Sequence, residues 1–224
     1  MRFTDDVYTF LSEIRFNNYK EWFEPRKAFY NSEIYQPLVA LGDALYSALA
    51  DENLKLRVTR IYKDITIPPH TRYRDTFYIY LRGEALWWSQ NPSLFVRLSP
   101  EGFSYGFQLT KPKPVIMEKF RNSIDRFLAV LPEGFDLGGE MYKRPKPCED
   151  PSLQKYFLLK GIELSRSGEA PTDEISGALR QLIPVYRYFE SLIDEQAEDA
   201  AAEKLELEDS MIPFEQVHLP EPDF

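Results

Sequence analysis

Cysteine and histidine are scarce in this sequence of 224 residues, which contains one Cys and two His. The single cysteine, Cys148, cannot form a disulfide within the chain and suits a reducing compartment, so we expect a cytoplasmic protein. Glu149 follows Cys148 directly, and an adjacent carboxylate argues against a reactive thiolate. With so few His and Cys ligands, we expect neither a metal site nor a cofactor.

Long apolar runs and catalytic signature motifs are also absent from the sequence. It does not open with a signal-peptide pattern, and no stretch approaches the length needed to cross a bilayer, so we expect no membrane association. It contains no P-loop, dinucleotide-binding fingerprint, serine nucleophile elbow or HExxH motif. These absences exclude several enzyme classes and point to no particular reaction.

The acidity of the chain is confined to one end. The formal net charge is −9, but the segment from Asp194 to Phe224 has eleven acidic residues and one lysine, a net charge of −10. The other 193 residues carry 26 basic and 25 acidic side chains, a net charge of +1. Bulk charge therefore does not predict a nucleic-acid partner, although a local basic patch can still attract anions.

Helical and extended patterns succeed one another along the chain. Apolar residues at helical spacing predict helices over 3–14, 22–50, 114–131, 152–159 and 172–195, the last with Thr172 as N-cap. Pro37 and Pro184 predict a kink or break inside two of these helices. Alternating apolar residues predict strands over 77–82, 94–98 and 103–109, and Ser99–Gly102 has the pattern of a type I turn.

This order of helices, meander and helices predicts a single α+β domain over residues 1–195, with a mostly antiparallel sheet packed by helices. Residues 196–224 are expected to form a flexible acidic tail.

The most informative segment is unusually basic. Residues 57–65 have the pattern of an extended segment, and between Lys55 and Arg82 there are seven basic and two acidic side chains. We therefore predict an anion site in which Arg60, Lys63, Arg72 and Arg74 bind a phosphate or carboxylate. The structural alternative is a salt-bridge network at the edge of a sheet.

The same segment offers weak candidates for acid/base chemistry. Asp64 would remain ionised beside arginines and would act as the base, with His70 or Tyr62 as its partner. The alternative for His70 is an ordinary solvated loop residue. An acid/base enzyme is therefore a second hypothesis, and a protein that interacts with partners through its acidic tail is a third.

Two further clusters are open to more than one interpretation. Lys143, Arg144 and Lys146 surround prolines and follow Tyr142, which suits either a solvated loop or stacking with nucleic acid. The pair Trp87–Trp88 suits either a plug in the core or an exposed platform for a ligand.

Several blocks together resemble a known family. They are Phe10–Leu11, Asn17–Asn18, Trp22–Phe23, the stretch from Arg60 to Asp64, the turn from Leu98 to Gly102, Lys143–Pro145 and Leu158–Gly161. Their order and spacing over residues 1 to about 195 are similar to those of the bacterial domain of unknown function 2461 family. That family has no assigned biochemical function, so the resemblance implies no reaction.

The hallmark of the family is an Arg-x-x-Arg-Asp-x-Arg-Phe core. Arg60 and Asp64 match it, Lys63 replaces an arginine, and Thr66 and Ile67 stand in place of the Arg and Phe. The resemblance is therefore to a divergent member.

Overall fold

The computed structural model describes residues 2–63, 66, 70–83, 90–144 and 146–194. The sequence predictions for Asp64, Trp87, Trp88 and the acidic tail therefore lie outside the described residues. Among the described helices, none combines the length and the apolar character needed to cross a membrane.

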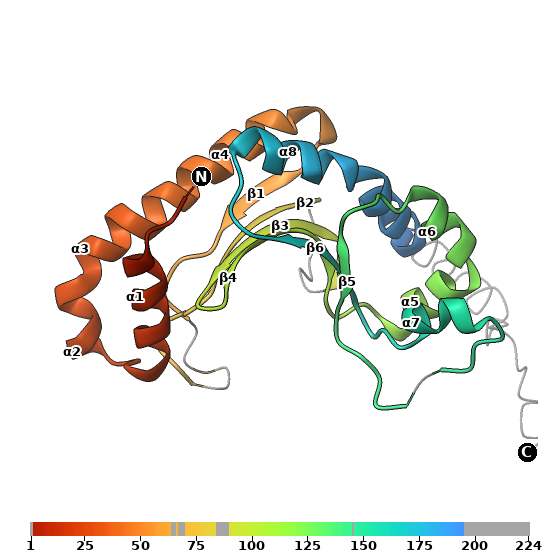
Figure 1. The fold of residues 1–224 in the computed structure, drawn as a ribbon, viewed down its shortest axis with the longest axis horizontal. Coiled ribbons are helices and arrows are strands. Elements are labelled where there is room, and N and C mark those ends of the chain that lie inside the picture. Colours follow the sequence, from red (N-terminus) through yellow and green to blue (C-terminus); the bar gives the residue numbers. More distant parts are fainter. Residues whose placement is uncertain (1, 64–65, 67–69, 84–89, 145, 195–224) are drawn as a thin grey trace, which may run out of the picture.

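The centre of the molecule is an antiparallel sheet of six strands, in the order β1-β2-β3-β4-β6-β5 (Figure 1). The strands are β1 (Lys55–Val58), β2 (Phe77–Arg82), β3 (Ser93–Ser99), β4 (Gly102–Leu109), β5 (Asp136–Gly138) and β6 (Ile162–Ser167). The predicted hairpin is confirmed as β3 and β4, which pair from Ser93 with Gln108 to Ser99 with Gly102. The expected α+β fold with a mostly antiparallel sheet is therefore correct.

Helices precede and follow the sheet strands. They are α1 (Asp5–Phe16), α2 (Lys20–Phe23), η1 (Glu24–Arg26), α3 (Lys27–Phe29), η2 (Tyr30–Tyr35), α4 (Gln36–Ala48), η3 (Ala50–Glu52), α5 (Pro114–Asn122), α6 (Ile124–Val130), η5 (Pro151–Leu153), α7 (Gln154–Phe157) and α8 (Thr172–Gln181). Residues 183–194 are helical as well.

Some predicted boundaries were wrong for local physical reasons. The helix over 114–131 is interrupted at Ser123, whose hydroxyl donates to the carbonyl of Lys119 and bends the chain. The stretch before Pro37 contains the π-helix η2, because proline cannot donate the next helical hydrogen bond. Helix α8 has Pro171, not Thr172, at its N-cap.

The predicted extended segment over 57–65 was also only partly correct. Regular strand β1 ends at Val58, and beyond it the pairing continues irregularly through backbone hydrogen bonds and a bridge between Tyr62 and Tyr73. Strands β5 and β6 were not predicted. Strand β5 has only three residues, and in β6 only Ile162 and Leu164 show the alternating burial that marks a strand.

Helices α4 and α8 cover one face of the sheet. Helix α4 contacts β1, β2 and α8, and α8 contacts β4 (Figure 1). Gly42 of α4 lies so close to the side chains of Val58, Leu56 and Ile79 that an added methyl group would touch them. The residues on this face of the strands are almost entirely buried, and they form the main core with the helices.

In the antiparallel pairing of β4 with β6, the residue opposite Ser165 is Gly106. A Cβ atom at this position would lie 1.9 Å from the carbonyl oxygen of Leu164, so the side chain of any other residue requires the two strands to move apart. The absence of a side chain at position 106 thus permits the pairing of β4 with β6.

We predict that Gly106→Ala lowers the free energy of unfolding by about 2 kcal/mol or more, because the added methyl group would collide with the backbone of the neighbouring strand β6. Urea denaturation measures the effect. Gly177→Ala is the matched control, since nothing lies within 4 Å of a Cβ there and alanine favours the helix α8. The control should be neutral or more stable than the wild type, and equal losses in both variants would contradict the proposed clash.

Candidate anion-binding site

The sheet has a second face, which points away from α4 and α8 and is much more polar. Side chains alternate along each strand, so the neighbours of the core residues project to this side. We call it the polar face, and its central residues are Arg57, Tyr78, Tyr80, Arg82, Phe95, Arg97, Ser104, Gln108 and Glu163.

Arginines surround Tyr80 on the polar face. The ring of Tyr80 stacks on that of Tyr78, with centroids 5.1 Å apart, and the guanidinium of Arg82 lies 5.7 Å from the centroid of Tyr80. Arg57 is the direct partner of Tyr80 in the pairing of β1 with β2. Burial raises the pKa of Tyr80 to about 12, and the charges of Arg82 and Arg74 oppose that rise. Tyr80 is therefore a neutral hydroxyl at the centre of a strongly basic region.

Arg97, in contrast, has a structural role, because its side chain bonds to residues of two other strands. Its guanidinium binds both carboxylate oxygens of Glu163, at 3.0 and 3.2 Å, and its Nε donates to Ser104 at 3.0 Å. Burial alone would lower the pKa of Arg97, but Glu163 raises it above its usual value. These bonds join β3, β4 and β6, so Arg97 stabilises the sheet.

The pairing of β1 with β2 continues irregularly beyond the sheet. We call this extension, residues 59–63 and 72–76, the basic ribbon. The amide of Lys63 donates to the carbonyl of Arg72 at 2.9 Å, and the amide of Arg74 donates to that of Ile61 at 2.7 Å. The pairing brings together the two halves of the basic segment that the sequence predicted.

The basic ribbon is fixed to the N-terminal helices by two side chains. The amide group of Asn18 bonds both backbone groups of Tyr73, donating to its carbonyl at 2.9 Å and accepting from its N–H at 2.8 Å. The hydroxyl of Tyr30, from the π-helix η2, accepts from the N–H of Ile61 at 3.1 Å. Both Ile61 and Tyr73 are almost fully buried, and the ring of Tyr73 lies 4.5 Å from that of Phe23.

The four predicted ligand residues differ in their surroundings. Arg60 and Arg72 are exposed, whereas Lys63 is half-buried and donates to the hydroxyl of Thr71 at 3.1 Å. Arg74 is half-buried, and its Nε is shielded from solvent with no hydrogen-bond partner among the described residues. The structure thus groups Arg74 with Arg57 and Arg82 near Tyr80, and leaves Arg60 and Arg72 open to solvent.

The structure describes two of the three predicted acid/base residues, Tyr62 and His70. Tyr62 has 52% of its surface exposed, and its ring contacts Phe23 and Tyr73. His70 is exposed and has a left-handed backbone, with φ of 60°. Asp64, the predicted base, lies outside the described residues, so an arrangement of Asp64 with His70 or Tyr62 stays a prediction. No group of three His, Cys, Asp or Glu side chains suited to a metal ion occurs in the described part of the chain.

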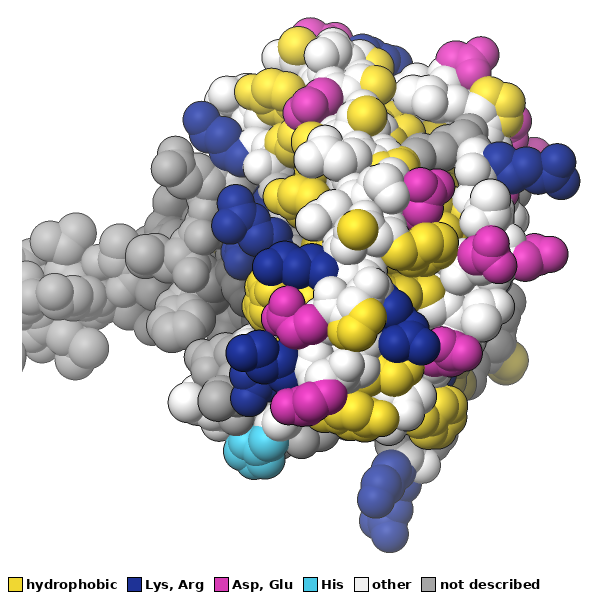
Figure 2. All heavy atoms as spheres, turned by 90° about the vertical axis from the view of Figure 1, so that its left-hand side faces the viewer, with side chains coloured by type: hydrophobic (Ala, Val, Ile, Leu, Met, Phe, Trp, Pro, Cys, Tyr) yellow, Lys and Arg dark blue, Asp and Glu magenta, His cyan; other side chains and the backbone are white. Residues whose placement is uncertain are grey.

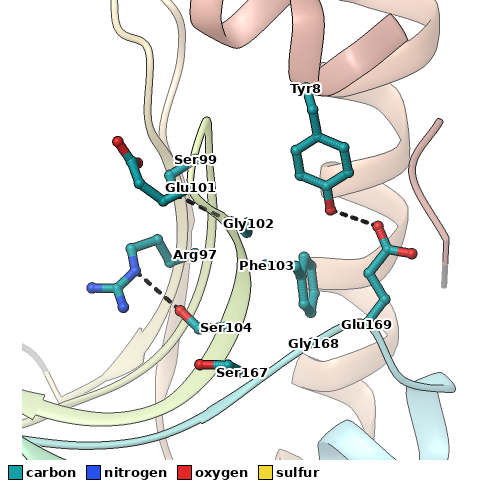
Figure 3. A pocket seen from close by; sticks show the side chains of 10 residues that line it. All are labelled: Tyr8, Arg97, Ser99, Glu101, Gly102, Phe103, Ser104, Ser167, Gly168 and Glu169. Atoms are coloured by element: carbon teal, nitrogen blue, oxygen red, sulfur yellow. Dashed lines mark hydrogen bonds between the residues drawn. The ribbon is translucent and has the colours of Figure 1, made fainter. Parts of the chain in front are cut away.

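Sequence reasoning missed a pocket of about 390 Å³ at the turn of the β3–β4 hairpin. Tyr8 donates to the carboxylate of Glu169 at 2.6 Å, and the N–H of Phe3 donates to the same oxygen at 2.9 Å. Burial, followed by Glu169, raises the pKa of Tyr8. Figure 3 shows this pair on one side of the hairpin and Arg97 and Glu101 on the other. The lining comes from three distant parts of the sequence, so no local motif marks the pocket.

Arg15 joins this pocket to the basic ribbon. Its Nε bonds Asp75 at 2.6 Å and its Nη1 bonds Glu101 at 2.5 Å. The hydrogen bond from Arg15 lowers the pKa of Glu101 to about 2. On the face of the molecule shown in Figure 2, several Lys and Arg side chains lie on the left, and others lie near the centre, at the upper right and at the bottom, with acidic side chains between them.

The comparisons with known proteins are consistent with the resemblance seen in the sequence. A family model described as "Conserved hypothetical protein (DUF2461)" matches residues 6–177. The chain belongs to the DUF2461 family. No curated protein and no solved structure matches the chain. The DUF2461 family has no activity in its description, so the geometry of the site is the basis for inferring a function.

We predict that Asn18→Ala lowers the free energy of unfolding by about 2–3 kcal/mol, because both backbone groups of Tyr73 lose their partner. Urea denaturation measures the loss. Asn17→Ala is the matched control, since the Asn17 amide donates to the exposed end of α1, at the carbonyl of Glu13. Equal effects of the two substitutions would contradict the role given to Asn18.

We also predict a pH effect from the pair of Arg15 and Glu101. The pKa of Glu101 falls from an ordinary value of 4.5 to about 2 in the folded protein. The pair therefore stabilises the fold fully above pH 4.5, and that contribution disappears as the pH falls towards 2.

Arg15→Ala should accordingly lose less stability than the wild type over this pH interval, as measured by urea denaturation at a series of pH values. Glu101→Gln should have the same effect, and should add nothing in the background of Arg15→Ala. Parallel pH profiles for wild type and Arg15→Ala would contradict the assignment.

Proposed function

We propose that this protein is an anion-binding module, and that its basic ribbon binds a small ligand bearing a phosphate or carboxylate group. Arg60 and Arg72 are the exposed donors, and Lys63 and Arg74 complete the site. Guanidinium groups suit this task because each offers a planar fork of N–H donors that matches the oxygens of such anions.

One observation carries this proposal. Within the described residues, the side chains of Arg57, Arg60, Arg72 and Arg74 form no ion pair. Elsewhere in the same structure, arginines do pair with carboxylates, as Arg15, Arg97, Arg180 and Arg187 each do. Among the described residues, these four arginines therefore take no part in a salt-bridge network of the kind that was the structural alternative.

Asp75 is the acidic residue of the segment that the structure describes, and it pairs with a residue outside the ribbon. Asp75 bonds Arg15 of helix α1, which leaves the arginines of the ribbon without its charge. A local excess of positive charge with free guanidinium groups favours binding of an anion from solution. We further propose a cytoplasmic location, which the single thiol of Cys148 supports.

The test is a thermal-shift titration with inorganic phosphate, a nucleoside monophosphate and citrate. We expect at least one of these anions to raise the melting temperature of the wild type, and Arg60→Ala combined with Arg72→Ala to abolish most of that rise. Lys27→Ala, which removes an exposed positive charge from α3, is the control for net charge and should retain it. A shift that survives the double substitution unchanged would rule out the ribbon as the site.

A further inference from the structure

A second cluster of cations lies at the other end of the molecule, where three positive groups converge on one tyrosine ring. The guanidinium of Arg121 lies 5.5 Å from the centroid of the Tyr142 ring. The ammonium groups of Lys146 and Lys160 lie 5.3 and 5.7 Å from it. Arg121 comes from α5, Lys146 from the loop after Tyr142, and Lys160 from the segment between α7 and β6, so the fold itself assembles the cluster.

Backbone bonds fix the ring and one of the cations in place. The N–H of Tyr142 donates to the carbonyl of Leu158 at 2.7 Å, and the N–H of Lys160 donates to that of Glu140 at 2.7 Å. The guanidinium of Arg121 donates to the carbonyl of Leu159 at 3.0 Å. Its Nε is shielded from solvent and has no hydrogen-bond partner among the described residues. The cluster therefore includes a donor that the fold leaves unused.

The charges in this cluster do not balance. Three cations within 6 Å of one ring centroid are close enough to repel one another. Glu140 supplies one negative charge, through its bond of 2.6 Å to Lys160, and Lys160 lowers the pKa of Glu140, so it stays ionised. The net charge around the ring is then +2, and the exposed residues Lys143 and Arg144 add to the positive field.

We propose that the cluster around Tyr142 binds a phosphate monoester or free phosphate as its dianion. A phosphate group of this kind carries close to two negative charges at neutral pH, which matches the excess of +2. Ammonium groups bind phosphate as point charges, and guanidinium adds directed N–H donors. This site is separate from the basic ribbon, because α5 and α7 lie at the opposite end of the molecule from α1 and α2 (Figure 1).

A titration followed by NMR would locate the binding site at the level of single residues. We would titrate the full chain, labelled with 15N, with inorganic phosphate and with glycerol phosphate, and follow the backbone amide signals. We expect the largest shifts at residues 140–144 and 158–161, and weaker binding of glycerol phosphate below about pH 6, where the monoester dianion takes up a proton. The described charged groups here are Arg121, Lys146 and Lys160, which contact the ring, Glu140, on which Lys111 also acts, and the exposed residues Lys143 and Arg144.

A pair of variants distinguishes a built site from general attraction. Lys146→Ala should weaken phosphate binding about tenfold, because it removes a charge-assisted contact. Lys143→Ala removes an equal charge from the same loop, and the exposed Lys143 is not among the described cations that lie over the ring, so this variant should change the affinity much less. Equal losses in the two variants, or shifts spread over the whole surface, would overturn the proposal.

Two further experiments test whether the ligand is a monoester or a nucleic acid, and whether this site binds independently of the ribbon. Arg60→Ala combined with Arg72→Ala should leave the titration at Tyr142 unchanged, so either site can fail independently of the other. A short oligothymidylate, which carries only singly charged diesters, should bind more weakly per phosphate than glycerol phosphate. Tighter binding of the oligonucleotide would overturn the monoester assignment in favour of nucleic acid.

Discussion

The arrangement of the basic ribbon depends on the side-chain amide of Asn18. This amide bonds the N–H and the carbonyl of Tyr73 as a neighbouring β-strand would, although the two residues are 55 positions apart. Tyr30 does the same for one group of Ile61 on the opposite strand of the ribbon. Unpaired backbone groups are costly to bury, so these bonds allow a ribbon that has left the sheet to pack against the helices.

The packing of the ribbon explains how its arginines can do without an ion pair to any residue that the structure describes. Burial of Ile61 and Tyr73 stabilises the ribbon through apolar contacts, including the ring of Phe23, and needs no help from charge pairing. The arginines beside them are therefore not required as structural ion pairs. On the polar face the opposite holds, because Arg97 and Glu163 join three strands.

Secondary structure could be predicted from the sequence where a local residue pattern specifies it. The β3–β4 hairpin has strict alternation and a turn with proline and glycine in fixed places, and both strands were predicted within one residue of their ends at the turn. Strand β6 was missed because only two of its side chains, Ile162 and Leu164, are buried. Contacts such as that between Asn18 and Tyr73, or between Arg15 and Asp75, join distant positions of the chain, and no periodicity encodes them.

Local charge, rather than the total, governs how this protein meets anions. A net charge of −9 would suggest repulsion, yet the attraction between charges in water fades within about 10 Å at ordinary salt. The ribbon and the cluster around Tyr142 lie in the part of the chain whose charge is nearly balanced, and each is separately basic. Because the two sites also lie at opposite ends of the fold, an anion at one of them experiences the cations of its own site and little of the other's field (Figure 1).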